Sequence, residues 1–157
     1  MARKEQNEGD KDVCRNRRAF HEYEVHDRLE CGLVLTGTEV KSLRDGHASI
    51  EEAYGKIDGG EVWLIGSDIP EYAMGNRLNH KPKRPRKLLL HKGEIAKFAG
   101  KASERGYTLV PLRLYFKNGR AKVELAVARG KKLHDKREDQ RKAEAKREIG
   151  RAMRKRI

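Results

Sequence analysis

Clusters of Lys and Arg are the most prominent candidates for a functional site in this sequence, because they can bind a negatively charged partner. The 157 residues hold 37 Lys and Arg against 24 Asp and Glu, which leaves a formal net charge of +13. Such an imbalance is typical of proteins with a polyanionic partner, a nucleic acid or less often an anionic membrane. The clusters are Lys41 with Arg44, the stretch 81–87, and Lys122 with the basic residues from 129 onward. They favour phosphate binding over the alternative, the ordinary exposed Lys and Arg of a soluble protein.

Nucleophiles and metal ligands form no recognisable pattern in this sequence. It contains no HExxH, GxSxG, P-loop, GxGxxG or CxxC motif. Adjacent residues on a helix do not face each other, so His134 and Asp135 make a poor acid/base pair, and Asp135 is better explained as a helix cap. Four residues could in principle gather around zinc, but their spacing matches no common zinc site: Cys14, His21, His26 and Cys31. We therefore expect no enzyme activity, no metal and no cofactor.

The sequence gives no sign of a membrane or of export. No apolar run approaches the roughly 20 residues that cross a bilayer. The first twelve residues, MARKEQNEGDKD, have basic residues but no apolar stretch after them, unlike a secretory signal. Two cysteines are too few for a disulfide framework in a chain of this size. We expect a cytoplasmic protein with reduced thiols that works as a monomer and does not bind membranes.

Composition divides the chain into three segments. Residues 1–18 mix both charges with hardly any apolar side chains, so we expect a disordered leader. Residues 19–130 hold most of the apolar residues and should form the folded body. Residues 131–157 carry 12 Lys and Arg against 5 Asp and Glu, a net charge of +7, which leaves +6 for the first 130 residues. The tail is therefore the densest source of positive charge.

Two hairpins carry the clearest structural signal in the body. Asp58-Gly59-Gly60 separates two runs that contain apolar residues. Asn118-Gly119 supplies the two residues of a type I′ turn between runs that alternate apolar and polar side chains. Pro111 falls outside the apolar alternation of its run and so indicates an edge or a bulge. Upstream, residues 20–35 predict a strand, a break and a second strand.

Short helices are expected in two places. Thr38 can cap a two-turn helix in which Val40 and Leu43 share a face, and Gly46 lies just past its end. His91 with Glu94 three residues later begins a second helix, and Gly106 is the candidate for its C-terminal cap, a position that glycine often occupies. Five to six short antiparallel strands with two or three short helices and no βαβ alternation predict a mainly β fold, a small antiparallel OB-like barrel.

The tail encodes a helix with little to hold it in place. Asp135 followed by Glu138 resembles a capping box for a helix that begins near Lys136. Its apolar stripe is too thin to pack firmly on a core, and Gly150 costs about 1 kcal/mol relative to Ala. The stripe consists of Ala145, Ile149, Ala152, Met153 and Ile157. We expect a tail that is disordered when free and helical when bound.

Several long strings resemble one known family. GLVLTGTEVKSLRDG, RPRKLLLHKGEI, RRAFHEYEV and the run from ERGYTLVPLR to GKKLHDKRE are similar to the SmpB family, the SsrA-binding proteins of bacterial trans-translation. The likeness runs in order from about residue 16 to residue 139. It implies an OB-like barrel without catalytic activity that binds the tRNA-like domain of transfer-messenger RNA. The complex enters stalled ribosomes, where the tail becomes helical in the decoding centre and the empty mRNA channel.

The resemblance also implies site residues in two groups. In the barrel, it implies contacts with transfer-messenger RNA by Glu39, Leu89, His91 and Lys122, and the cations Lys41 and Arg44 beside Glu39 extend that surface. Position 91 is often Asn in this family, so His91 changes the geometry of that contact. In the tail, the segment that engages ribosomal RNA at the decoding centre is implied to contain Gly130, Lys131, Lys132, His134, Asp135, Lys136 and Arg137.

The residues alone leave some of these roles open. Glu39 is either an acceptor for RNA donors or a helix N-terminal acid that suits the helix dipole. Leu89 could be an ordinary core leucine. Lys122 shares a strand face with Glu124, opposite to Val123 and Leu125, and so should be exposed. Aromatic residues are only 6% of the chain, which makes base stacking a secondary mode of binding.

Overall fold

A computed structural model describes residues 11–75, 78–131 and 133–155. The described strands are β1 Lys11–Arg15, β2 Tyr23–Leu33, β3 Tyr54–Asp58, β4 Glu61–Ile65, β5 Arg86–Leu89, β6 Tyr107–Lys117 and β7 Arg120–Gly130. The helices are α1 Arg17–Glu22, α2 Gly37–Arg44, α3 Lys92–Ala102 and α4 Leu133–Lys155. None of the described helices is both long enough and apolar enough to span a membrane.

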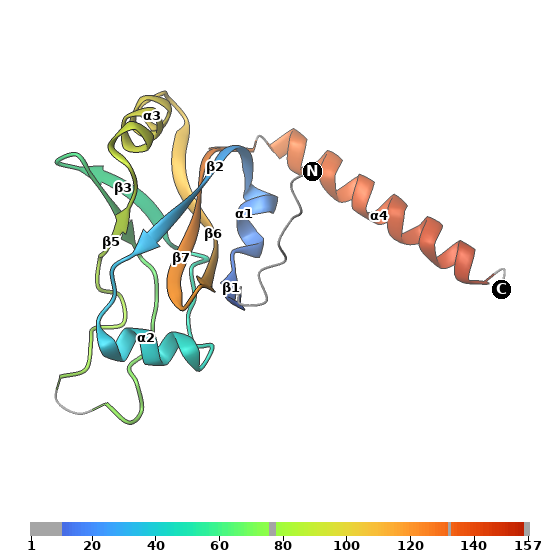
Figure 1. Cartoon of the computed structure of the whole chain (residues 1–157). Helices are drawn as coiled ribbons and strands as arrows, with labels where there is room; N and C mark the ends of the chain where they lie inside the picture. The colour runs from blue at the N-terminus through green and yellow to red at the C-terminus, as the bar shows by residue number, and fades with distance from the viewer. Residues whose placement is uncertain (1–10, 76–77, 132, 156–157) are drawn as a thin grey trace, which may run out of the picture.

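The strands form one antiparallel sheet that closes on itself. Its order is β1-β6-β3-β4-β5-β2-β7, and β7 also pairs with β6, so six strands form a closed ring to which β1 adds at β6. Figure 1 shows α3 over one end of this ring and α2 at the opposite end. This arrangement is a small OB-like barrel, as the sequence predicts, with seven described strands in place of five to six.

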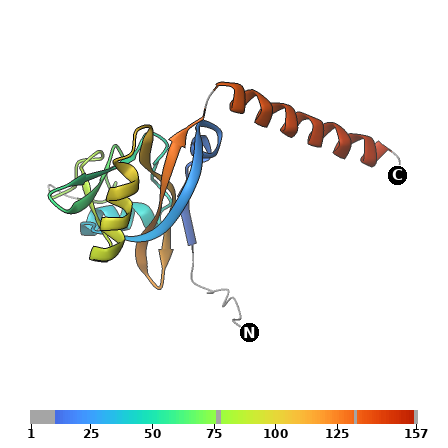
Figure 2. The same ribbon diagram turned by 90° about the horizontal axis from the view of Figure 1, so that it is seen from above.

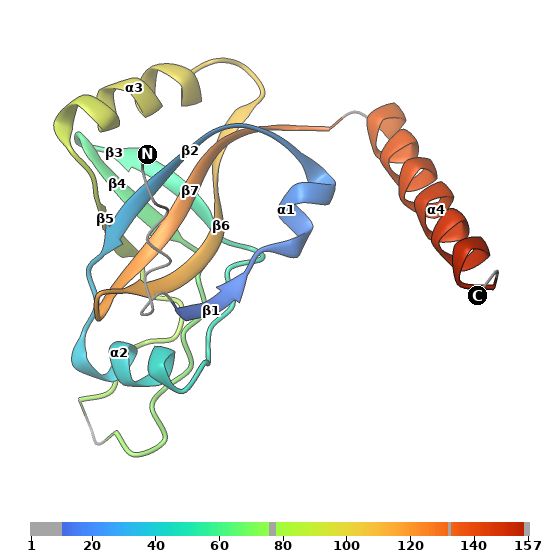
Figure 3. The same ribbon diagram turned by 45° about the vertical axis from the view of Figure 1, so that its right-hand side comes forward.

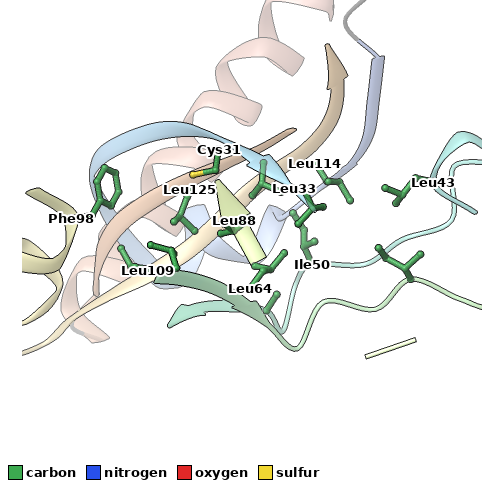
Figure 4. Packing of buried hydrophobic residues seen from close by; sticks show 14 of the residues in the cluster. Cys31, Leu33, Leu43, Ile50, Leu64, Leu88, Phe98, Leu109, Leu114 and Leu125 are labelled. Carbon is green, nitrogen blue, oxygen red and sulfur yellow. The ribbon is translucent and has the colours of Figure 1, made fainter. Parts of the chain in front are cut away.

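Apolar side chains fill the inside of the barrel. Leucines from several strands meet there, and Leu43 of α2 and Phe98 of α3 close the two ends (Figure 4). A second, smaller cluster lies under α1, where Ala19 packs on Val110 and Leu112 of β6 and on two alanines of β7. The barrel interior therefore holds the core and leaves the outer faces of the strands for other contacts.

The two hairpins form at the predicted turns. Asn118 and Gly119 have φ values of 50° and 75°, as a type I′ turn requires, and Gly59 and Gly60 also have positive φ. The register of β6 against β7 shifts between Pro111 and Arg113, which confirms the bulge. Because of the bulge, apolar side chains of β6 lie on both faces of the sheet. Leu114 and Phe116 belong to the core of the barrel, whereas Val110 and Leu112 belong to the smaller cluster under α1.

The N-terminal part of the body differs from the sequence expectation. Lys11–Arg15 pair with β6, and Arg17–Glu22 form a short helix, although the sequence suggests a disordered leader over residues 1–18. Asn16 anchors this region because its buried side chain donates to the carbonyl of Pro111 and accepts from Ala19 N–H. Residues 1–10 lie outside the described residues. The expected break within residues 20–35 is absent, since β2 pairs with β7 and β5 as one continuous strand.

Local signals place the two short helices well, with shifts of a few residues. Thr36, rather than Thr38, caps α2, and its backbone N–H donates to Glu39 Oε1 at 2.9 Å. His91 caps α3 together with Glu94 as predicted. The helix ends at Ala102, so Gly106 serves the turn into β6, where its φ is 88°.

Helix α4 leaves the barrel and extends into solvent. Figures 2 and 3 show it pointing away from the body, with α1 on the side of the barrel nearest to it. It begins at Leu133, three residues before the predicted start. In the described part of the apolar stripe, Ile149 and Met153 expose 59% and 67% of their surface. The helix is thus formed in this structure, but it is not packed on the core.

Candidate nucleic-acid interface

A buried ion-pair cluster joins α2 to the loop before β5. Glu39 of α2 and Arg86 of β5 are both fully buried, and their side chains form a salt bridge. Arg86 Nη1 also donates to Ser67 O at 3.0 Å, and its Nη2 donates to Pro82 O at 3.0 Å. Arg84 Nη2 binds the second carboxylate oxygen of Glu39. One carboxylate therefore holds two arginines and fixes the course of the loop.

Electrostatics keep this carboxylate ionised. Burial by itself would raise the pKa of Glu39, but hydrogen bonds from Arg84, from Thr36 N–H and from Arg86 outweigh burial and lower the pKa to about 2. The Arg84 side chain is about a third exposed, and its Nε is buried without a hydrogen-bond partner among the described atoms. Glu39 thus holds Arg84 at the surface with one donor unused.

Two residues of the predicted interface consequently lie elsewhere than expected. The resemblance implies that Glu39 accepts from RNA, yet its side chain is inaccessible and both of its oxygens are occupied. The sequence places Arg86 in the basic stretch 81–87, but the residue is part of the interior. Burying both groups costs less than burying either alone, because each compensates the charge of the other. Among the residues of this cluster, Arg84 is the one that reaches solvent.

The loop between β4 and β5 is fastened to α2 by further polar contacts. Ser42 Oγ donates to Pro70 O at 2.7 Å, and the buried ring of His80 bonds Thr38 Oγ1 at 2.9 Å and Ile69 O at 2.7 Å. Because a carbonyl oxygen can only accept, His80 Nε2 carries a proton. These contacts hold the basic loop next to the exposed cations of α2, Lys41 and Arg44.

The outer face of the barrel brings two other predicted residues close together. Gly32 of β2 lies opposite Lys122 of β7 on one side and opposite Leu89 of β5 on the other. Leu89 is 53% exposed, so it is not a core leucine, and Lys122 is partly exposed. A Cβ at position 32 would lie 3.2 Å from Leu89 Cβ, so a larger residue there would push the Leu89 side chain aside. The result is an outer row of Leu89, Gly32 and Lys122.

His91 continues this surface beyond the end of β5. It lies two residues after Leu89, its side chain is 94% exposed, and its backbone N–H donates to Glu94 Oε1 at 3.2 Å. The imidazole takes part in the capping box of α3, with Nε2 3.9 Å from Glu94 Oε1, yet its exposure leaves it within reach of a partner. The structure brings Leu89, His91 and Lys122 to one outer surface, whereas Lys41 and Arg44 lie at the α2 end of the barrel.

The predicted tail residues lie at the far end of β7 from Lys122. Gly130 pairs with Tyr23, about 27 Å along the strand from Lys122 at 3.4 Å per residue. Lys131 is only 16% exposed, because its Nζ donates to Phe20 O at 3.0 Å and forms an ion pair with Asp139. Lys132 lies outside the described residues. His134, Asp135 and Lys136 belong to the first turns of α4, where Arg137 is exposed.

The cysteines show no feature of a reactive centre. Burial raises the pKa of Cys14 to about 11 and that of Cys31 to about 12, so both thiols remain protonated at neutral pH. Within the described residues, no group of three or more His, Cys, Asp and Glu side chains could hold a metal ion. The arrangement is suited to binding a polyanion through exposed cations, apolar contacts and one imidazole.

Comparison with known proteins identifies the family of this chain. A family model described as SmpB protein matches residues 13–155. This chain belongs to the SmpB family. It is 58% identical to the SsrA-binding protein of Thermobifida fusca over 99% of both chains. It is also 56% identical to the SsrA-binding protein of Geobacter sulfurreducens, over 93% of this chain and 95% of that protein.

A solved structure agrees with the family assignment. The chain aligns with a chain of "tmRNA-SmpB: a journey to the center of the bacterial ribosome" at 46% identity and a TM-score of 0.66. The alignment covers 76% of this chain and 85% of that one. The resemblance to the SmpB family inferred from the sequence strings is therefore confirmed, and the barrel described above is the fold of an SmpB-family protein.

Proposed function

We propose that this SmpB-family protein binds the tRNA-like domain of transfer-messenger RNA and delivers it to stalled ribosomes for trans-translation. The observation that carries the proposal is the outer row, in which the exposed Leu89 and the cation Lys122 lie on either side of Gly32 on the outer face of the barrel. Relatives named SsrA-binding protein across nearly the full length of both chains support the identity of the RNA.

The contacts with this RNA are made by residues that the barrel presents to solvent. Leu89, His91 and Lys122 bind directly, and Lys41 and Arg44 add phosphate contacts at the α2 end. Glu39 acts as a positioning residue, because its carboxylate holds Arg84 at the surface and Arg86 in the interior. Loss of Glu39 would then weaken RNA binding because Arg84 is no longer held in position, and not because a direct hydrogen bond to the RNA is lost.

The tail acts on the ribosome. Helix α4 projects from the body with its apolar stripe and many of its cations exposed, so it is free to lie along the RNA of the decoding centre and the empty mRNA channel. The segment Gly130, Lys131, Lys132, His134, Asp135, Lys136 and Arg137 makes the first of these contacts. A helix that lacks tertiary support in water becomes fully ordered only there. The protein is an adaptor in the cytoplasm that acts as a monomer and does no catalysis.

Truncation separates the two activities. A chain that ends after Arg129 keeps the barrel, so we expect its affinity for transfer-messenger RNA to stay within about threefold of the full chain, a difference of ~0.7 kcal/mol. Tagging of stalled peptides should be abolished. If the truncated barrel loses all affinity for this RNA, the division between barrel and tail is refuted.

Competition distinguishes this function from general RNA binding. At moderate salt, an excess of bulk tRNA should leave most of the labelled transfer-messenger RNA bound, whereas a nonspecific basic protein would release it. Lys122→Ala should weaken binding and lower the salt dependence by about one released ion. Arg17→Ala removes an equal charge from α1 and serves as the matched control, with affinity expected to be unchanged.

A further inference from the structure

The single tryptophan of the chain lies on the outer face of the barrel. Trp63 is in β4, between Val62 and Leu64, which are buried in the core, so its side chain points to the opposite face. It is partly exposed, unlike its two neighbours. A tryptophan placed for stability would gain more from the core, because burial of its large apolar surface stabilises the fold.

Two lysines flank Trp63 on the neighbouring strands. Lys56 of β3 and Lys87 of β5 are its direct partners in the sheet register, and directly opposed residues share a face. Strands lie about 4.8 Å apart, so both ammonium groups can reach the phosphates on either side of a base that lies on the indole. The three residues form an outer platform of cation, aromatic ring and cation.

The cations of this platform are available to a ligand. Lys56 is exposed and takes part in no ion pair among the described residues. Lys87 pairs with Glu61 at 3.0 Å, but the two side chains are 38% and 45% exposed, and exposed pairs of this kind are weak. A phosphate can therefore replace Glu61 at small cost.

The platform continues into the outer row. On β5, Leu89 is the next outward residue after Lys87, and Val34, which is 44% exposed, lies beside Lys87 because its N–H donates to Lys87 O at 3.1 Å. The outward side chains of neighbouring strands therefore include Lys56 of β3, Trp63 of β4, Lys87 and Leu89 of β5 and Lys122 of β7, with Glu61 of β4 beside Lys87. Stacking of bases on an aromatic residue within a positively charged strip is the usual way to hold unpaired nucleotides.

We propose that Trp63 is a stacking platform for an unpaired base of the bound RNA, with Lys56 and Lys87 on the phosphates that flank it. The inference rests on the proposed function and extends it, since it adds recognition of an unstacked nucleotide to the contacts of Leu89, His91 and Lys122. Trp63 then favours an RNA with exposed loop bases over a fully paired duplex of equal charge.

Fluorescence can detect a contact between Trp63 and RNA directly, because Trp63 is the only tryptophan in the sequence. Titration of the unmodified protein with an RNA that carries a tRNA-like loop should quench this fluorescence. The midpoint of the quenching curve should equal the midpoint of a binding curve measured by anisotropy of the labelled RNA. A paired duplex of the same length should bind more weakly and leave the fluorescence unchanged. Equal quenching by both RNAs would overturn the inference.

Substitutions measure the contribution of the ring. Trp63→Leu should weaken binding of the loop RNA about tenfold, within the range found for loss of one stacked base. Trp63→Phe keeps an aromatic face and should recover most of the affinity. Phe20→Leu, which changes an exposed aromatic residue on α1, is the matched control and should leave the affinity within about twofold, or ~0.4 kcal/mol. Thermal melts should show that all three variants fold.

Each outcome points to one hypothesis. If the RNA binds by anisotropy while the fluorescence stays constant and Trp63→Leu binds normally, Trp63 is only part of the sheet surface, and the proposed function stands. If no tRNA-like RNA binds to the unmodified protein by either signal, the proposed function itself fails. If RNA binding by Lys56→Ala and Lys87→Ala has the same salt dependence as binding by the unmodified protein, and the RNA still quenches Trp63, the phosphate contacts are rejected and the stacking stands.

Discussion

Two cation-rich segments of this protein have opposite fates. The stretch 81–87 holds five Lys and Arg and no acid, and the tail from residue 131 to 157 holds twelve Lys and Arg. In the first, Arg86 is fully buried and paired with Glu39 from a distant helix. In the second, α4 projects from the body, and its Ile149 and Met153 stay exposed. A cation of a basic run therefore becomes part of the interior or stays available to a ligand according to whether a carboxylate meets it inside the fold.

The difference follows from the cost of removing a charge from water. A guanidinium can enter the interior only with a partner charge and hydrogen bonds for its remaining donors, and Arg86 has both. In the described part of the tail, the ion pair between Lys131 and Asp139 ties the first turns of α4 to the end of β7. The cations farther along α4 are exposed and hydrated, and hydrated cations are the ones that can exchange water and counterions for RNA phosphates.

The largest expected effect is the loss of Glu39. Glu39→Gln keeps the shape of the side chain but leaves Arg86 as a buried charge without its counter-charge, so the free energy of unfolding should fall by about 3–5 kcal/mol. Urea denaturation followed by far-UV circular dichroism measures it. Glu61→Gln, which breaks only the exposed pair with Lys87, is the matched control and should cost less than about 1 kcal/mol. Equal losses in the two variants would mean that the buried pair is no different from a surface pair.

Acid should weaken the barrel through the same carboxylate. The pKa of Glu39 is about 2 in the folded protein against 4.5 for an ordinary glutamate, so the folded state takes up this proton less readily than the unfolded chain. Its contribution to stability is present above pH 4.5 and is lost as the pH falls toward 2, which amounts to about 3 kcal/mol.

Urea denaturation midpoints measured at a series of pH values from about 6 down to about 2 test this linkage. The unmodified protein should lose more stability over this interval than Glu39→Gln, which has no carboxyl to titrate at this position. Parallel curves for the two proteins would show that Glu39 does not have the lowered pKa on which the expectation depends.

The tail should contribute least to stability. Removal of the residues after Gly130 deletes α4 and the contacts of Lys131, so the free energy of unfolding of the barrel should change by less than about 1 kcal/mol. Amide exchange of the intact free protein should be fast throughout α4 and slow in β6 and β7. Protection in α4 comparable to that of these strands would show that the two cation-rich segments are equally anchored.

Local sequence signals predicted the elements that depend on neighbours in the chain. The Asn118-Gly119 turn, the cap of α3 at His91 and the bulge at Pro111 all follow from backbone preferences of a few adjacent residues. The signals failed where a distant strand supplies the stability. Strand β1 has few apolar residues and exists through its pairing with β6, and β2 passes through Cys31-Gly32 without a break because strands pair with it on both sides.

The sequence predicted some positions of the candidate site and missed others. Alternation along β7 correctly placed Lys122 on the outer face, and the same alternation around Trp63, between two buried aliphatic residues, was the signal that could have added it to the site. Glu39 could not be resolved from the sequence, because its two arginine partners follow 45 and 47 residues later. No local pattern connects residues at that separation.

The amino-acid sequence by itself determined the net charge, the turns of the two hairpins and the family to which the chain belongs, since these depend on composition and on neighbouring residues. Only the tertiary structure decided which cations face solvent and so can meet RNA. Closure of the barrel brought Glu39 to Arg84 and Arg86 and withdrew Arg86 from solvent, and it aligned Leu89, Gly32 and Lys122 from three strands. Charge is a property of the residue, whereas its exposure depends on what the fold places beside it.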